Sequence, residues 1–443
     1  MLWTLLLKEC RQMLKCLTYY VIIICMLLIY TTQLGSENVS KPIPGQESYG
    51  FAASEDESVI MNMSLANLTR EYLYNNYSTY PIGFIKKVVL SKEKQREIGD
   101  IITEVTGMER DQLDDWLKES YSDKYWVDSS GNGDSYSISA NGEVVAKEGD
   151  AQEPNTNTTG TDGSDELQLK VLPDVTYEHF TELMTKADKL LGGGSSYARD
   201  ELQSNAYVPK TYEQALQDYN DIIEKDHLTG AYARIFCDYL GITLAILPVF
   251  LAVTRGLRDR RAKAAEIIGS RRASSFHIVI SRYLAMVTML LLPVLLLSSF
   301  MGIACIITGV RQGIAVDYLA FPKYILVWLL PTIMITTSVG MLLTELTDTA
   351  LAIIVQGFWW YISAFTGNLS GNCGWNLLPR HNTVGEYDLF MENIRQFTLN
   401  RMVYTLIAIL LLFISIWLYE SKRRGRLDIR GKIFPHRRVK FEE

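Results

Sequence analysis

Cysteine is absent from the longest polar part of this sequence. The chain has 443 residues and six cysteines, and none of the six lies between residues 35 and 230. A polar segment of this length without cysteine cannot be held together by disulfide bonds, so it must rest on a hydrophobic core of its own. This absence favours a bacterial cell surface over an animal extracellular domain.

The usual sequence patterns of catalytic and nucleotide-binding sites are also missing. The five histidines are scattered, and the sequence contains no H-E-x-x-H, no G-x-S-x-G and no cysteine pair with zinc spacing. Three glycines at 192–194 precede two serines, but a P-loop needs a preceding strand and a lysine. We interpret the glycines as a turn that ends a helix. We therefore expect no enzyme activity, and no cofactor or metal held by this chain.

Charge is divided unevenly along the sequence, whose net charge is −7. Residues 35–230 carry 36 Asp and Glu against 17 Lys and Arg, and the remaining residues carry 14 against 26. An acidic part and a basic part in one chain indicate two different environments, and they argue against a nucleic-acid-binding protein.

Long apolar runs predict six transmembrane helices. We place them at residues 17–34, 231–254, 282–309, 322–345, 350–366 and 400–420. Lys and Arg are concentrated in 1–16, 255–281 and 421–443, which puts these segments and both termini on the cytoplasmic side. A cleaved signal peptide is the alternative for the first span, but no small-residue cleavage site follows it.

Residues 1–16 form an amphipathic helix suited to a membrane interface. Its apolar side carries Trp3, Leu6, Leu7, Cys10, Met13 and Leu14, and its polar side carries Lys8, Glu9, Arg11, Gln12 and Lys15. The predicted fold is therefore an all-α polytopic membrane protein that begins with an interfacial helix.

Residues 35–230 are predicted to form a large, mainly helical extracellular domain between the first two spans. Ser91 is expected to cap one helix, a second helix begins at Thr176, and Thr211 with Gln214 forms a capping box for a third. Residues 147–166 are a polar linker, and residues 367–399 form a second outer loop.

Two charged residues lie in the second predicted span. Arg234 and Asp238 are four positions apart, so they share a helix face and can pair within the membrane. Ionisable groups inside a span are candidates for function, although a pair near the outer interface can equally serve as an anchor.

The segment 255–281, which we call the basic loop, lies between two apolar spans and holds seven Lys and Arg. Its AKAAEII stretch consists of good helix formers, and Gly269 then stops the helix before Arg271 and Arg272. A short basic helix confined to the cytoplasm is typical of a docking element. The alternative is that the loop only fixes topology.

Two segments together resemble the permease subunits of type-two ABC exporters. LLLKECRQMLKC before the first span is similar to the elbow helix of that family, and RDRRAKAAEIIGSRRASSFHIVISRYLA is similar to its coupling-helix loop. The resemblance implies a separate ATP-binding subunit that docks on this loop, with contacts through Glu266, Arg271, Arg272 and Ser274. It also implies that ATP is bound by the partner, that a second permease chain completes the pathway, and that the protein lies in a bacterial plasma membrane, in a Gram-positive organism.

The large outer domain departs from the drug and polysaccharide exporters of that family, and it leaves the substrate open. Two other functions remain. A transporter of the lipoprotein-export kind has a large outer domain after its first span, but it uses four spans per chain. A non-transporting sensor or scaffold with a ligand-binding outer domain needs no permeation path.

Overall fold

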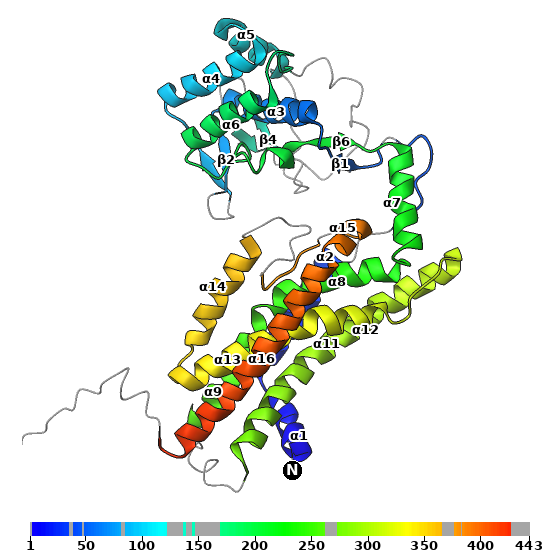
Figure 1. Ribbon diagram of the computed structural model, residues 1–443, viewed down its shortest axis with the longest axis vertical. Helices are drawn as coiled ribbons and strands as arrows, with labels where there is room; N and C mark the ends of the chain where they lie inside the picture. The colour runs from blue at the N-terminus through cyan, green and yellow to red at the C-terminus, as the bar shows by residue number, and fades with distance from the viewer. Residues whose placement is uncertain are drawn as a thin grey trace, which may run out of the picture. The chain divides into compact units, whose positions relative to one another are not determined.

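The structure is a computed structural model (Figure 1) that describes residues 2–34, 39–46, 48–80, 85–121, 136–138, 144–146, 169–261, 273–365, 376–381 and 383–426. The chain divides into two compact units. Unit 1 comprises Met1–Lys41 and Leu216–Glu443, and unit 2 comprises Pro42–Ala215. The predicted linker 147–166 lies outside the described residues.

Unit 1 is built from helices. They are α1 (Leu2–Met13), α2 (Leu17–Gln33), α7 (Tyr212–Glu224), which begins at the end of unit 2, α8 (Thr229–Leu244), α9 (Leu247–Arg261), α11 (Ser275–Gln312), α12 (Ala320–Tyr324), the π-helix η2 (Ile325–Leu329), α13 (Leu330–Thr347), α14 (Leu351–Phe365), α15 (Tyr387–Glu392) and α16 (Ile394–Arg423). Helices α11, α13 and α16 run side by side along the unit (Figure 1).

Several of these helices can cross a membrane. Among the described residues, three stretches are long and apolar enough: α11, the run from α12 to α13, and α16. The number rises to five if two bent helix pairs are each one span, α1 with α2 at 71° and α8 with α9 at 40°. The predicted fifth span, 350–366, corresponds to α14, which is apolar but shorter. The protein is therefore a multi-pass helical membrane protein.

The helix ends differ from the predicted span boundaries. The third predicted span, 282–309, is the central part of α11, and the sixth, 400–420, is the central part of α16. Hydropathy detects only the apolar section of a helix, whereas these two helices continue past it with polar turns at both ends. As a result, the predicted basic loop overlaps both helices: its first residues, up to Arg261, belong to α9, and its last, from Ser275, belong to α11.

The break between α8 and α9 is stabilised by polar side chains from neighbouring helices. Gln356 donates a hydrogen bond of 2.6 Å to the carbonyl of Ala245, and the Trp360 indole donates one of 2.9 Å to the carbonyl of Ile242. A helix break inside an apolar bundle leaves backbone carbonyls without their usual donors, so such partners are required. These two hydrogen bonds therefore stabilise the 40° bend between α8 and α9.

Helices α9 and α13 cross at close range because each presents a glycine to the other. A Cβ atom at Gly340 would lie 2.7 Å from Cβ of Ala252, and one at Gly256 would lie 2.8 Å from the Cγ2 methyl of Thr344. Small residues at a crossing let helix backbones approach and increase van der Waals contact. This crossing fixes the end of α9 from which the basic loop departs.

Unit 2 has a hydrophobic core of its own. Its helices are α3 (Glu57–Tyr74), α4 (Lys92–Thr106), α5 (Arg110–Tyr121), α6 (Tyr177–Leu191) and the 3-10 helix η1 (Leu202–Asn205). Buried Leu65, Leu68, Ile98, Ile102, Phe180 and Met184 pack between them. The predicted caps are confirmed: Ser91 and Thr176 cap α4 and α6, Thr211 and Gln214 bond each other's backbone N–H groups at the start of α7, and Gly192 ends α6 in a left-handed conformation.

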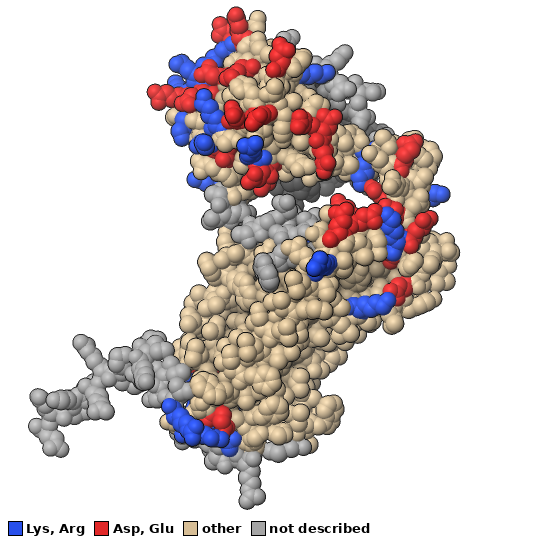
Figure 2. All heavy atoms as spheres, viewed as in Figure 1, with Lys and Arg blue, Asp and Glu red and all other residues tan. Residues whose placement is uncertain are grey.

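Three short antiparallel strand pairs complete unit 2. They are β1 (Phe51–Ala53) with β6 (Tyr207–Pro209), β2 (Tyr77–Thr79) with β3 (Lys86–Val88), and β4 (Tyr136–Ile138) with β5 (Val144–Ala146). The β1–β6 pair joins the beginning and the end of the unit. Lys, Arg, Asp and Glu are intermixed over the visible surface of unit 2, whereas the middle of the unit 1 helices shows almost no charge (Figure 2).

Candidate functional site

Three of the four residues predicted to contact an ATPase, Glu266, Arg271 and Arg272, lie outside the described residues. The fourth, Ser274, is exposed and forms the N-cap of α11. Its hydroxyl accepts a hydrogen bond from the backbone N–H of His277 and lies 2.6 Å from Nδ1 of the same residue. Ser274 therefore has a structural role in starting α11, and it stands where the basic loop ends.

Four charged residues meet where the two ends of the basic loop come together, and we call them the loop cluster: Glu9, Arg255, Asp259 and Arg282. Arg255 donates two hydrogen bonds of 2.6 Å to the carboxylate of Glu9, and its Nη1 lies 3.1 Å from Asp259. Arg282 pairs with Asp259 and lies 3.6 Å from Glu9. The four side chains are only 7% to 18% exposed, and their charges balance.

The loop cluster connects three helices that are far apart in sequence. Glu9 belongs to α1, Arg255 and Asp259 belong to the last turns of α9, and Arg282 belongs to the start of α11. Bidentate arginine–carboxylate contacts are the strongest and most directional of the common ion pairs. The helices that enter and leave the basic loop are thus held to each other and to the N-terminal helix.

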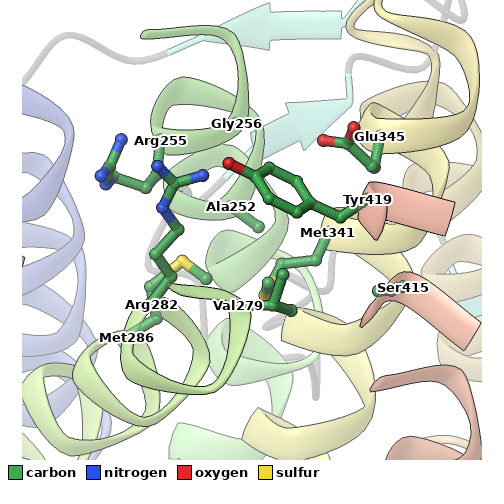
Figure 3. A pocket seen from close by; sticks show the side chains of 10 residues that line it. All are labelled: Ala252, Arg255, Gly256, Val279, Arg282, Met286, Met341, Glu345, Ser415 and Tyr419. Atoms are coloured by element: carbon green, nitrogen blue, oxygen red, sulfur yellow. The ribbon is translucent and has the colours of Figure 1, made fainter. Parts of the chain in front are cut away.

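A hollow opens next to the loop cluster (Figure 3), with about 400 Å³ of empty volume that includes open solvent. It is lined by Ala252, Arg255, Gly256, Val279, Arg282, Met286, Met341, Glu345, Ser415 and Tyr419. Charged and aromatic groups gather on one side of it, and the methionines lie on the other (Figure 3). The Arg282 guanidinium stacks over the Tyr419 ring at 5.8 Å, which adds α16 to the elements held by the cluster.

Helix α16 also holds the beginning of α11 by polar contacts. Arg423 donates a hydrogen bond of 2.7 Å to the carbonyl of Ala273, and the hydroxyl of Ser275 donates to Glu420. Lys422 pairs with Asp348 at 2.7 Å at the end of α13. The start of α11 is therefore held by the C-terminal turns of α16, which Lys422 in turn joins to the end of α13.

The predicted pair of Arg234 with Asp238 is replaced by two other pairs. Arg234 pairs with Asp226, and Asp238 pairs with Arg380 at 2.8 Å. Both predicted residues are nearly fully buried. The rule that residues four positions apart can pair considers only one helix. In the structure, Asp226 comes from the stretch before α8, and Arg380 comes from a segment that is distant in sequence. We call Asp226, Arg234, Asp238 and Arg380 the far cluster, because it lies at the opposite end of the span formed by α8 and α9.

The described residues on either side of position 382 contact the far cluster. Arg234 also donates to the carbonyls of Val384 and Gly385 at 3.4 and 3.2 Å, and His381 contacts the Gly385 carbonyl at 3.0 Å. Burial, and secondly the charge of Arg234, lower the pKa of His381 from 6.5 to about 4. His381 is therefore neutral at physiological pH and adds no charge to the cluster.

Sequence reasoning missed most of the loop cluster. It assigned Glu9 to the polar side of an interfacial helix and gave Asp259 and Arg282 no role. One signal was present: Glu9 is the only acidic residue among residues 1–34. A single carboxylate among apolar and basic residues is a candidate for an ion pair, but the sequence does not select Arg255 among the available cations.

No group of three His, Cys, Asp or Glu side chains suited to a metal ion occurs in the part of the chain that the structure describes. The loop cluster instead connects helices through balanced ion pairs.

Comparison with known proteins identifies the family. The sequence profile of the ABC-2 family transporter proteins matches residues 16–374, a range that includes all of unit 2 and most of unit 1. No curated protein and no solved structure matches the chain. The basic loop, the loop cluster and the apolar helices lie in a chain that belongs to the ABC-2 transporter family, whose members are membrane components of transporters.

Proposed function

We propose that the chain is the membrane-spanning permease subunit of an ATP-binding-cassette exporter in a bacterial plasma membrane, from a Gram-positive organism. It has six spans, both termini lie in the cytoplasm, and unit 2 lies outside the cell. The family membership and the concentration of Lys and Arg in three segments support this topology. ATP is bound and hydrolysed by a separate subunit.

The ATPase subunit docks on the basic loop, and the observation that carries this proposal is the loop cluster. A loop that only fixes topology needs no buried ion pairs between the helices on either side of it. Here Asp259 and Arg282 join the helix before the loop to the helix after it, and Arg255 joins both to Glu9 in α1. The connection makes α1, α9 and the start of α11 one mechanical body.

Movement of the docked ATPase is then transmitted as a rigid-body displacement. Glu266, Arg271, Arg272 and Ser274 contact the ATPase, and the loop cluster passes the force to α9 and α11. Ion pairs in a low-dielectric site resist separation, because each separated partner would be left buried without a counter-charge. The crossing of α9 with α13 at Gly340 and Gly256 carries the displacement into the bundle.

A second permease chain, identical or related, completes the pathway. Helix α14 leaves large apolar side chains exposed, including Ile354 and Phe358. Such a surface in a membrane protein is covered by lipid or by another chain. The family resemblance favours a second permease chain on part of this surface and lipid on the rest.

The test is co-purification from native membranes. The tagged protein is extracted in mild detergent, and the accompanying chains are identified and assayed for ATP hydrolysis. We expect a soluble ATP-binding subunit to accompany the wild-type protein and to be lost from the Glu266→Ala/Arg271→Ala variant. Lys92→Ala/Glu93→Ala is the matched control, because it removes the same two charges from the exposed surface of unit 2.

Two outcomes contradict the proposal. An ATPase that co-purifies equally well with both double variants is not docked through these loop residues. The absence of any ATPase from the wild-type preparation favours a sensor or scaffold, and the basic loop then serves topology alone.

A further inference from the structure

One face of the β2–β3 hairpin in unit 2 carries exposed apolar side chains. The register pairs Tyr77 with Val88, Ser78 with Lys87 and Thr79 with Lys86. Side chains alternate between the two faces of a strand. Tyr77 and Thr79 are buried in unit 2, so Ser78 and the next residue, Tyr80, point away from it.

The opposite strand presents Ile85, Lys87 and Val89 on the same outward face. A hydrogen bond of 2.9 Å from Nζ of Lys87 to the Ser78 hydroxyl shows that these two residues share this face. Tyr80, Ile85 and Val89 are 47%, 59% and 73% exposed. Three large apolar side chains beside Lys87 form an amphipathic surface that is exposed among the described residues of unit 2.

The composition of this face matches a membrane interface. Tyrosine prefers the level of the lipid headgroups, and lysine is attracted to anionic lipids while its alkyl chain stays in apolar surroundings. Lys87 lies on this face, in a segment that is strongly acidic overall. An anionic bilayer repels the acidic surface and attracts this one, so the charge distribution selects the face that meets the lipid.

Unit 2 is also tethered to the bilayer. Helix α2 ends at Gln33 and unit 2 begins at Pro42, so the connecting chain reaches at most about 30 Å. A unit of this length has a radius of gyration of about 16 Å. A body with this radius of gyration is about 40 Å across, so the connection lets unit 2 turn all but its most distant faces toward the lipid surface, and tethering raises its effective concentration there.

We propose that the outward face of the β2–β3 hairpin, formed by Tyr80, Ile85, Lys87 and Val89, binds the surface of an anionic bilayer and anchors unit 2 to it. The inference needs only the tether and the exposed face, and it does not depend on transport or on an ATPase. Contact of this kind limits the orientations of unit 2 and keeps it against the membrane.

The experiment places a spin label on the hairpin of the full-length protein. Val89→Cys is made in a variant whose six native cysteines are replaced by alanine, and the labelled protein is reconstituted in phosphatidylcholine vesicles with phosphatidylglycerol. Collision of the label with oxygen, which concentrates in lipid, is compared with collision with a water-soluble nickel chelate. Leu172→Cys is the matched control, because Leu172 is an exposed apolar residue elsewhere on unit 2.

We expect the ratio of oxygen to nickel collisions to be several-fold higher at position 89 than at position 172. Lys87→Glu in the Val89→Cys protein is expected to lower this ratio toward the control value, since each lysine near an anionic surface contributes about fivefold to binding.

Three results overturn the proposal. Frequent nickel collisions at position 89 would show a face in water, and low collision rates with both reagents would show a face covered by protein, such as a second copy of the chain. A high oxygen ratio that persists with Lys87→Glu, and in vesicles of phosphatidylcholine alone, would show apolar contact without selection for anionic lipid. If unit 2 remains folded, the ratio of oxygen to nickel collisions at position 172 stays at the value of a water-exposed site in all variants.

Discussion

The loop cluster and the far cluster lie at the two ends of the span formed by α8 and α9, and their contacts differ. In the far cluster the charges form separate pairs, Arg234 with Asp226 and Arg380 with Asp238. In the loop cluster each arginine approaches both carboxylates, so that Arg255 and Arg282 share Glu9 and Asp259. One end of the span is therefore held by pairs and the other by a network.

This difference indicates different mechanical roles. Among the described residues, Asp226 pairs with Arg234 alone, so removing Arg234 leaves a buried carboxylate without its cation. A network of shared contacts can lose or lengthen one contact while the others keep the charges compensated. The far cluster is suited to fix the segment 376–386 on α8, and the loop cluster is suited to hold helices that have to move together.

Removal of Arg234 should have the largest effect on stability. Arg234→Met leaves the Asp226 carboxylate, which is 2% exposed, buried without its cation. We expect a loss of about 3–5 kcal/mol in the free energy of unfolding, measured as a fall in the thermal unfolding midpoint in detergent. Lys323→Met is the matched control, because Lys323 pairs with Asp317 at the surface and such pairs contribute at most about 1 kcal/mol.

The double variant Asp226→Asn/Arg234→Met sharpens this comparison. Removing both charges leaves no unpaired ion, so we expect the double variant to recover most of the loss. A midpoint for Arg234→Met that equals that of Lys323→Met would show that the pair carries little of the stability of this end.

Acid should destabilise the far cluster through His381. The folded protein keeps His381 neutral down to its pKa of about 4, whereas the unfolded chain protonates it near 6.5. The unfolded state thus binds more protons between these values, and stability falls as the pH drops from 6.5 to 4. The shift corresponds to about 3 kcal/mol.

The groups around His381 account for its lowered pKa, and therefore for the loss of stability in acid. Arg234 faces it with a positive charge, the Phe390 ring packs against it at 5.6 Å, and the Gly385 carbonyl accepts from it. The measurement compares unfolding midpoints of wild type and His381→Gln across this pH range. Glutamine keeps a donor for Gly385 but does not titrate, so the fall in unfolding midpoint that His381 causes in acid should disappear. Identical pH profiles of wild type and variant would contradict the prediction.

The comparison of the clusters also shows where prediction from sequence succeeds. Hydropathy and helical periodicity located the apolar helices, and local capping patterns located the ends of α4, α6 and α7, because these signals depend on neighbouring residues. The partners of Arg234 and Arg255 depend on distant residues. Asp238 and Arg380 are 142 positions apart and Glu9 and Arg255 are 246 positions apart. The four-residue spacing therefore did not identify these partners, and Glu9 was placed on a surface.

Loss of Arg255 should cost less stability than loss of Arg234. Arg282 remains close to both carboxylates after Arg255→Gln, so neither acid is left without a cation, and we expect a loss of about 1–3 kcal/mol. A double-mutant cycle with Arg282→Gln checks the network directly. Shared contacts predict a coupling energy between the two arginines of about 0.5–3 kcal/mol, and strictly additive effects would show that the arginines act independently.

Ser274→Ala should have the smallest effect, because it removes only the cap of α11. We expect a loss of about 1 kcal/mol at this helix end, seen as roughly fivefold faster hydrogen exchange of the His277 amide. Ser299→Ala is the matched control, since Ser299 lies in the same helix and bonds only to the carbonyl four residues earlier. Equal exchange in both variants would contradict a capping role.

Ser274→Asp separates the cap from the proposed contact with an ATPase. Aspartate is as good an N-cap as serine, so exchange of the His277 amide should stay slow. The added negative charge, however, stands at the end of the basic loop, where the partner is expected to bind. Slow exchange together with loss of the co-purifying ATPase would therefore assign Ser274 to the docking surface, and slow exchange with the ATPase retained would leave Ser274 as the residue that starts α11.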